Sequence, residues 1–172
     1  MWRLPIKMDH KIRILGFCFV VDDIPDLIRK VNSLTGDSCV VQLLNAEGIA
    51  GERHVLHSTY QAIYAFKRGD NIASDLGLEI CVRASAQRQI SKALKILGLK
   101  KGLNRICAVL VDCNQQTVEK LKKLLGQTNH EVLIADEEYL KNLYNISLDE
   151  ITSSGGLTKA MMERTTLLVL ET

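Results

Sequence analysis

Aromatic residues and prolines are few in this sequence, and no apolar run is long enough to span a membrane. Aromatic side chains make up 5% of the 172 residues, so a binding face built mainly of stacked rings is not expected. The longest apolar runs, residues 14–21 and 106–111, fall far short of the roughly 20 residues that a bilayer demands. Residues 3–13 carry several charges, unlike a signal peptide, so we expect a cytoplasmic protein without membrane contact.

Motifs for catalysis, cofactor binding and metal binding are also missing. The sequence contains no phosphate-binding loop, no dinucleotide fingerprint and no nucleophile elbow. His54 and His57 could share a helix face, but no third ligand follows at a spacing that is typical of a metal site. The five cysteines include no Cys-x-x-Cys pair, which suits small core side chains in a reducing compartment. The sequence therefore predicts a protein that is not an enzyme and has no cofactor, metal or small-molecule substrate.

The pattern of apolar residues predicts an α+β fold in a single domain over residues 1–172. We expect one small mixed sheet with helices packed on it and a three-helix insertion. Three helices are expected between residues 52 and 99, of which the third is capped by Ser85 and ends at Gly98, with Leu94 on its inner face. The other predicted elements are strands at residues 11–21, 38–49, 105–112 and 131–135, helices at 24–36, 114–126 and 137–144, and a last segment at 157–170 that fits either a helix or a strand.

Positive charge is concentrated in one window of the sequence. Between residues 80 and 111 there are seven Lys or Arg residues and no acid, whereas the whole chain has a net charge of only +2. On a helix that starts at Ser85, the side chains of Arg88 and Lys92 share one face, and Arg83 and Gln87 lie near its N-terminus. A concentration of positive charge attracts polyanions, most commonly nucleic acid. A solvated helix face explains the charge pattern about equally well.

Several motifs in and around this window resemble one known family. They are residues 54–62 (HVLHSTYQA), residues 72–90 (IASDLGLEICVRASAQRQI) and the Ala93-Leu94 pair before Gly98. Looser matches occur at residues 42–46 (QLLNA) and 163–168 (ERTTLL), where Thr166 replaces an expected alanine. In this pattern the chain resembles the small regulatory subunit of the KEOPS complex.

The resemblance implies a non-catalytic role in making threonylcarbamoyl-adenosine on tRNA. A subunit of this family binds the small atypical kinase/ATPase of the complex, supports its activity and holds tRNA by the single-stranded 3′ CCA end. We accordingly expect RNA contacts from Arg83, Ser85, Gln87, Arg88, Gln89, Lys92 and His57, and kinase contacts from Glu163, Leu167 and Leu168. Two alternatives remain: a protein-interaction adaptor without RNA contact, and a small nucleic-acid enzyme that uses His54 or His57.

Overall fold

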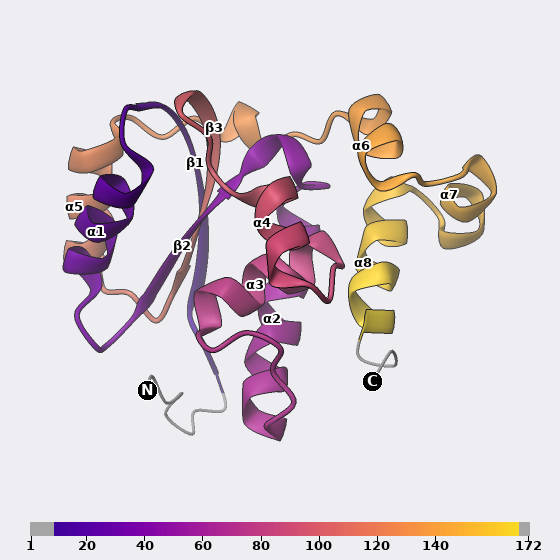
Figure 1. Ribbon diagram of the computed structural model, residues 1–172, viewed down its shortest axis with the longest axis horizontal. Helices are drawn as coiled ribbons and strands as arrows, with labels where there is room; N and C mark the ends of the chain where they lie inside the picture. The colour runs from indigo at the N-terminus through magenta and orange to yellow at the C-terminus, as the bar shows by residue number, and fades with distance from the viewer. Residues whose placement is uncertain (1–8, 169–172) are drawn as a thin grey trace.

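The computed structural model describes residues 9–168, which form three strands, eight α-helices and two short 3-10 turns (Figure 1). The strands are β1 (Ile12–Val21), β2 (Val40–Asn45) and β3 (Gly102–Val111). The helices are α1 (Ile24–Thr35), α2 (Glu52–Arg68), α3 (Leu76–Ser85), α4 (Ile90–Leu97), α5 (Gln115–Leu125), α6 (Glu137–Tyr144), α7 (Leu148–Ser154) and α8 (Leu157–Leu167), and the 3-10 turns are η1 (Ala46–Gly48) and η2 (His130–Leu133).

The sheet has the strand order β1-β3-β2, and both pairings are antiparallel. The α+β prediction is confirmed, but the prediction of a mixed sheet is wrong. β1 and β2 run in the same direction and are joined through α1, as in a parallel crossover. The later strand β3 inserts between them, with Val111 aligned with both Ile12 and Val40, so no two parallel strands are adjacent.

Helices cover both faces of the sheet. Figure 1 shows α1 and α5 on one side, α2, α3 and α4 on the other, and α6 to α8 farther out on that second side. On the first side, Val31 of α1 and Leu121 of α5 pack with Phe17 of β1 in one apolar cluster. On the second side, Leu44 of β2 packs with Ile80 of α3 in the other. The sheet is therefore buried on both faces along β3, which explains the continuous apolar run of that strand.

Several helices begin or end where the sequence predicts, because the expected capping residues are in place. The Asp23 side chain accepts a hydrogen bond from the Asp26 N–H at 3.0 Å and caps α1, which Gly36 ends. Asn114 caps α5 in the same way, by accepting from the Thr117 N–H. The predicted helix at residues 137–144 matches the bounds of α6.

Other predicted elements differ from the structure. Ser85 does not begin a helix: it is the last residue of α3, because Ala86 turns into the left-handed conformation and stops the helix there. The next helix, α4, begins at Ile90, and Leu94 on that helix is 43% exposed rather than on the inner face. The predicted strand at 131–135 is instead the 3-10 turn η2, and the ambiguous last segment forms the helix α8.

Within residues 9–168, no helix is both long and apolar enough to cross a membrane.

Candidate functional site

The last turns of α8 lie against α2 and against the turn that joins α3 to α4. His57 of α2 is 2.8 Å from the Thr166 hydroxyl, measured from Nε2 to Oγ1. Arg88 of the α3–α4 turn donates from Nη1 to the Leu168 carbonyl oxygen at 3.3 Å. Two groups of residues that the sequence assigns to different partners, at positions 57–92 and 163–168, are therefore neighbours in space.

Two residues predicted to contact RNA are buried in α3. The Arg83 side chain is 2% exposed, and its Nη2 lies 2.7 Å from Oε1 of a fully buried Glu79. Ser85 is also fully buried, and its hydroxyl donates to the Val82 carbonyl within the same helix. The prediction that Arg83 and Ser85 lie at a helix start is wrong, because the all-round apolar surface of α3 carries both into the core.

The other predicted RNA contacts of the basic window lie around the start of α4. Arg88, Gln89 and Lys92 are exposed, and Gln87 is half-buried. Gln89 occupies the N-cap position of α4, and its side chain makes no capping hydrogen bond. The first N–H groups of a helix have no partner within it, and the helix dipole makes this end positive. Free backbone donors and two exposed basic side chains thus gather at one point, an arrangement that suits a phosphate group.

His54 uses both of its ring nitrogens inside the protein. Nδ1 accepts from the Ala50 N–H at 2.9 Å, so Nε2 carries the proton that it donates to the Ala84 carbonyl, also at 2.9 Å. Burial lowers the pKa of His54 to about 4, which keeps the ring neutral. Its role is to join α2 to α3 and to the turn before α2. Among residues 9–168, no three His, Cys, Asp or Glu side chains form a group that could hold a metal ion.

His57, three residues later, faces α8 and is only partly buried. The Thr166 hydroxyl donates to the Met162 carbonyl at 2.9 Å, so its oxygen is left to accept from Nε2 of His57. Partial burial lowers the pKa of His57 and so favours the neutral ring, which donates this hydrogen bond in the tautomer that carries its proton on Nε2. Thr166 stands where the family pattern has an alanine. Its hydroxyl is hydrogen-bonded to His57, and an alanine could not form this bond.

The exposed face of α8 carries an open, mainly apolar hollow of about 380 Å³. Leu167 lies in it and is 51% exposed, and Glu163 accepts a hydrogen bond from the Ser154 hydroxyl at its edge. Leu168, by contrast, is 2% exposed and belongs to the core cluster. The prediction that the Leu168 side chain is presented to a partner is wrong, and only Glu163 and Leu167 of the predicted kinase contacts face outward.

An ion pair that the sequence analysis missed holds α7 against α8. The Arg164 guanidinium contacts both carboxylate oxygens of Glu150, each at 2.7 Å. The same guanidinium donates to the Tyr144 carbonyl at 2.7 Å, at the end of α6. Arg164 therefore fixes the elements that surround the hollow. Its partner lies fourteen residues away in another helix, so no local spacing rule could have found the pair.

Comparison with known proteins points to one family. Residues 20–168 match the family described as Kinase binding protein CGI-121. The chain is 34% identical over 131 residues to the Regulatory protein Cgi121 of Methanocaldococcus jannaschii, across 76% of this chain and 83% of the relative. It is 30% identical over 114 residues to the KEOPS complex subunit Cgi121 of Pyrococcus abyssi, across 66% of this chain and 64% of the relative. These matches agree with the resemblance found in the sequence.

Proposed function

Because the chain belongs to the CGI-121 family of kinase-binding proteins, we propose that it is a non-catalytic subunit of a KEOPS complex. In this role it binds the small kinase/ATPase subunit, supports the activity of that subunit and recruits tRNA through the 3′ CCA end. The observation that carries the proposal is the proximity of an exposed apolar hollow on α8 to the basic start of α4. One protein could then hold a kinase and an RNA end side by side.

The hollow on α8 supports the kinase-binding part of the proposal. Protein interfaces are anchored by apolar side chains that fill depressions on the partner, and polar groups surround such anchors. Leu167 provides an exposed apolar side chain, and Glu163 and Lys159 provide charges at the rim. The ion pair between Arg164 and Glu150 keeps α7 and α8 in place, so the surface is formed before a partner binds.

Kinase binding is tested with a single charge placed in the hollow. Leu167→Asp should weaken co-purification with the kinase subunit at least 10-fold, and the kinase's ATPase rate should fall to the level seen without this chain. The matched control is Leu103→Asp, at an exposed leucine on β3 that is distant from α8 in sequence and fold. If both variants bind the kinase equally well, α8 is not the contact. A steady ATPase rate of the isolated chain that a point mutation removes would overturn its non-catalytic role.

The start of α4 supports the RNA-binding part of the proposal. A single-stranded 3′ end offers phosphates that backbone N–H groups and Arg or Lys side chains can bind, and unstacked bases with free edges. Arg88 supplies a planar guanidinium, Lys92 a point charge, and Gln87 and Gln89 supply amides able to donate to and accept from a base edge. Because Arg83 and Ser85 are buried, the proposed contacts are Gln87, Arg88, Gln89, Lys92 and His57.

RNA binding is tested by reversing charges at this site. Arg88→Glu and Lys92→Glu should each weaken tRNA binding, and each lost phosphate contact should lower the slope of log K against log salt by roughly 0.7. The control is Lys123→Glu, an exposed lysine on α5 beyond the other face of the sheet. Equal binding by all three variants would favour an adaptor that makes no RNA contact.

Trimming the tRNA identifies which part of it is held. Removal of the CCA end should cost about as much affinity as Arg88→Glu, because both changes remove one interaction. The two losses should then not add when they are combined. Fully additive losses would place the CCA contact elsewhere on the protein.

A further inference from the structure

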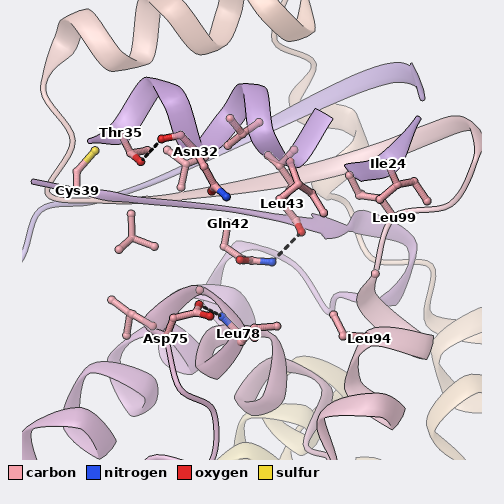
Figure 2. Close-up of a pocket in the computed structure, with 17 residues that line it drawn as sticks. Ile24, Asn32, Thr35, Cys39, Gln42, Leu43, Asp75, Leu78, Leu94 and Leu99 are labelled. Carbon is pink, nitrogen blue, oxygen red and sulfur yellow. Dashed lines mark hydrogen bonds between the residues drawn. The ribbon is translucent and has the colours of Figure 1, made fainter. Parts of the chain in front are cut away.

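A groove of about 540 Å³ runs between α1 and the pair α3 and α4, with β2 along its floor (Figure 2). Its walls are mostly aliphatic, and two of the apolar residues that line it, Ile28 of α1 and Leu94 of α4, are 48% and 43% exposed. An exposed apolar depression of this size is typical of a binding site. Neither the kinase contact nor the RNA contact proposed above uses the residues of this groove.

The floor of the groove is an unpaired edge of the sheet. Within residues 9–168, β2 pairs with β3 and with no second strand. The Leu43 carbonyl faces the groove, where the side-chain amide of Gln42 donates to it at 3.3 Å (Figure 2). Because the backbone groups of alternate residues in an antiparallel strand point to the same side, those of Val41 and Cys39 also face the groove. The groove therefore presents backbone donors and acceptors at strand spacing, which another extended backbone matches best.

The Gln42 side chain imitates one bond of such a backbone. Its Nε2 gives the Leu43 carbonyl the same kind of N–H contact that a neighbouring strand would supply. Its Oε1 lies against Gly77 of α3, where a Cβ atom would overlap it, so the absence of a side chain at Gly77 leaves the amide room to reach the edge. A strand that replaces this bond would offer the edge several donors and acceptors in place of one amide.

The groove carries charge of one sign only. Asp75, the N-cap residue of α3, is the one charged side chain among the described residues that line it. Its Oδ1 atom accepts the Leu78 N–H at 2.9 Å, and the residue is exposed on the α3 wall. A basic side chain on this wall would meet a carboxylate of opposite charge, whereas an acidic side chain would be repelled. The charge of the groove therefore favours a basic occupant.

The two walls specify how the side chains of an occupant alternate. Val41 and Leu43 point towards α1, as members of its apolar cluster. In a strand added to this edge, the residues opposite them would contact Ile28 of α1, and the residues between would face Asp75 of the α3 wall. We propose that the groove binds an extended segment of a partner protein as a fourth strand, in which aliphatic residues alternate with Lys or Arg. The edge over residues 39–43 is about 14 Å long, which is enough for five residues of such a segment.

N-methylated peptides test the backbone part of the proposal. The probe is the peptide acetyl-Val-Lys-Val-Lys-Val-amide, whose binding to the full chain is measured by titration. N-methylation of the central valine removes an N–H group that would face β2, and it should weaken binding at least 10-fold. N-methylation of a lysine is the matched control, because its N–H group would face away from β2, and it should change binding less than twofold. Equal weakening by both changes, or no binding of the unmodified peptide at millimolar concentration, would overturn the proposal.

Hydrogen exchange locates the bound peptide on the sheet. The probe peptide should slow amide exchange at Val41 and Leu43 at least 10-fold. Exchange at Cys18 and Val20 of β1, at the other edge of the sheet, should not change. Slower exchange at these two β1 positions instead would place the peptide on the wrong edge and overturn the proposal. Protection of Val41 and Leu43 that needs no peptide and rises with protein concentration would assign the edge to a second copy of the chain, which would also overturn it.

Asp75→Asn tests the charge of the occupant without removing the helix cap, because asparagine caps a helix about as well as aspartate does. At low salt, wild type should bind the probe at least threefold more tightly than a peptide with glutamine in place of both lysines, and Asp75→Asn should show no such preference. The matched control is Asp136→Asn, the same change at the N-cap of α6 outside the groove, which should keep the wild-type preference. Loss of the preference in both variants, or its absence in wild type, would overturn the proposed alternation of aliphatic and basic residues.

Discussion

Arg83 and Glu79 form an ion pair in the interior of the protein, with side-chain exposures of 2% and 0%. Both Nη2 and Nε of the guanidinium lie within 2.8 Å of one carboxylate oxygen, Oε1. The other oxygen accepts the backbone N–H groups of Ile72 and Ala73, at 2.9 and 2.6 Å. The pair therefore joins one turn of α3 to the loop that precedes it.

Arg83→Ala is expected to destabilise the fold by about 3–5 kcal/mol, because it leaves the Glu79 carboxylate buried without a counter-charge. Urea unfolding measures this loss. The double variant Glu79→Gln/Arg83→Met removes both charges and should recover a large part of it, because the buried charge is then gone. An Arg83→Ala protein of normal stability that no longer binds tRNA would restore Arg83 as an RNA contact.

His54 should make stability depend on pH. Burial lowers its pKa from 6.5 to about 4, so the folded state favours the neutral ring and the unfolded chain binds the proton more readily. The stability that comes from this difference is fully present above pH 6.5 and is lost as the pH falls towards 4. The full loss is about 3 kcal/mol.

Denaturant unfolding at several pH values between 7 and 4 measures the His54 effect. In His54→Gln the extra loss of stability between pH 6.5 and 4 should disappear, although the variant is less stable throughout. His130→Gln, at an exposed histidine on η2, is the matched control for the loss of an imidazole elsewhere in the chain. If His54→Gln keeps the full dependence, another group is responsible.

Local signals in the sequence were enough to predict α1, α5 and α6, because each begins with an Asp or Asn whose side chain caps it. The boundary between α3 and α4 was not predictable in the same way. Ser85 precedes an apolar stripe and resembles a cap, but buried neighbours such as Val82 and Ala84 continue α3 through it. The helix ends because Ala86 adopts the left-handed conformation. Alanine, unlike glycine, does not indicate such a helix end in a sequence.

The candidate site was also predicted only in part, because some of its contacts depend on packing between distant segments and not on local sequence. Arg88, Gln89 and Lys92 are exposed as expected, because charged and amide side chains favour solvent wherever the helix begins. The burial of Arg83 depends on Glu79 four residues earlier, a spacing that is visible in the sequence and that pairs the two side chains on one face of α3. The contact of His57 with Thr166 joins residues 109 apart, so it follows from the packing of α8 on α2 and not from any local pattern.

Gly16 is expected to tolerate no side chain. Its carbonyl accepts the Asn129 N–H at 2.7 Å, and a Cβ atom on Gly16 would overlap the Asn129 carbonyl oxygen and crowd Val132. Gly16→Ala should therefore destabilise the protein by about 1–3 kcal/mol, because η2 must move away from β1. Thermal unfolding measures the change. Cys18→Ala, at an exposed position two residues along the same strand, should change stability by less than about 0.5 kcal/mol.

The pair Arg164 and Glu150 yields the last prediction. Its two short contacts form a bidentate ion pair, in which the hydrogen bonds from Arg164 lower the pKa of Glu150. Glu150→Gln keeps the shape of the side chain but removes its charge. We expect a loss of about 1 kcal/mol at neutral pH, and faster amide exchange in α7, which the pair holds against α8.

The sign of the pH dependence separates this ion pair from simple packing. Because the folded state lowers the pKa of Glu150, the contribution of the pair is present above the ordinary glutamate pKa of 4.5 and is lost as the pH falls below it. Wild type and Glu150→Gln should therefore converge in stability at acid pH. Glu138→Gln is the control, because its single 3.5 Å contact with Lys141 is largely exposed and should contribute almost nothing. If the difference between wild type and Glu150→Gln persists at pH 3, shape rather than charge joins α7 to α8. Kinase binding would then depend on packing around the hollow and not on this pair.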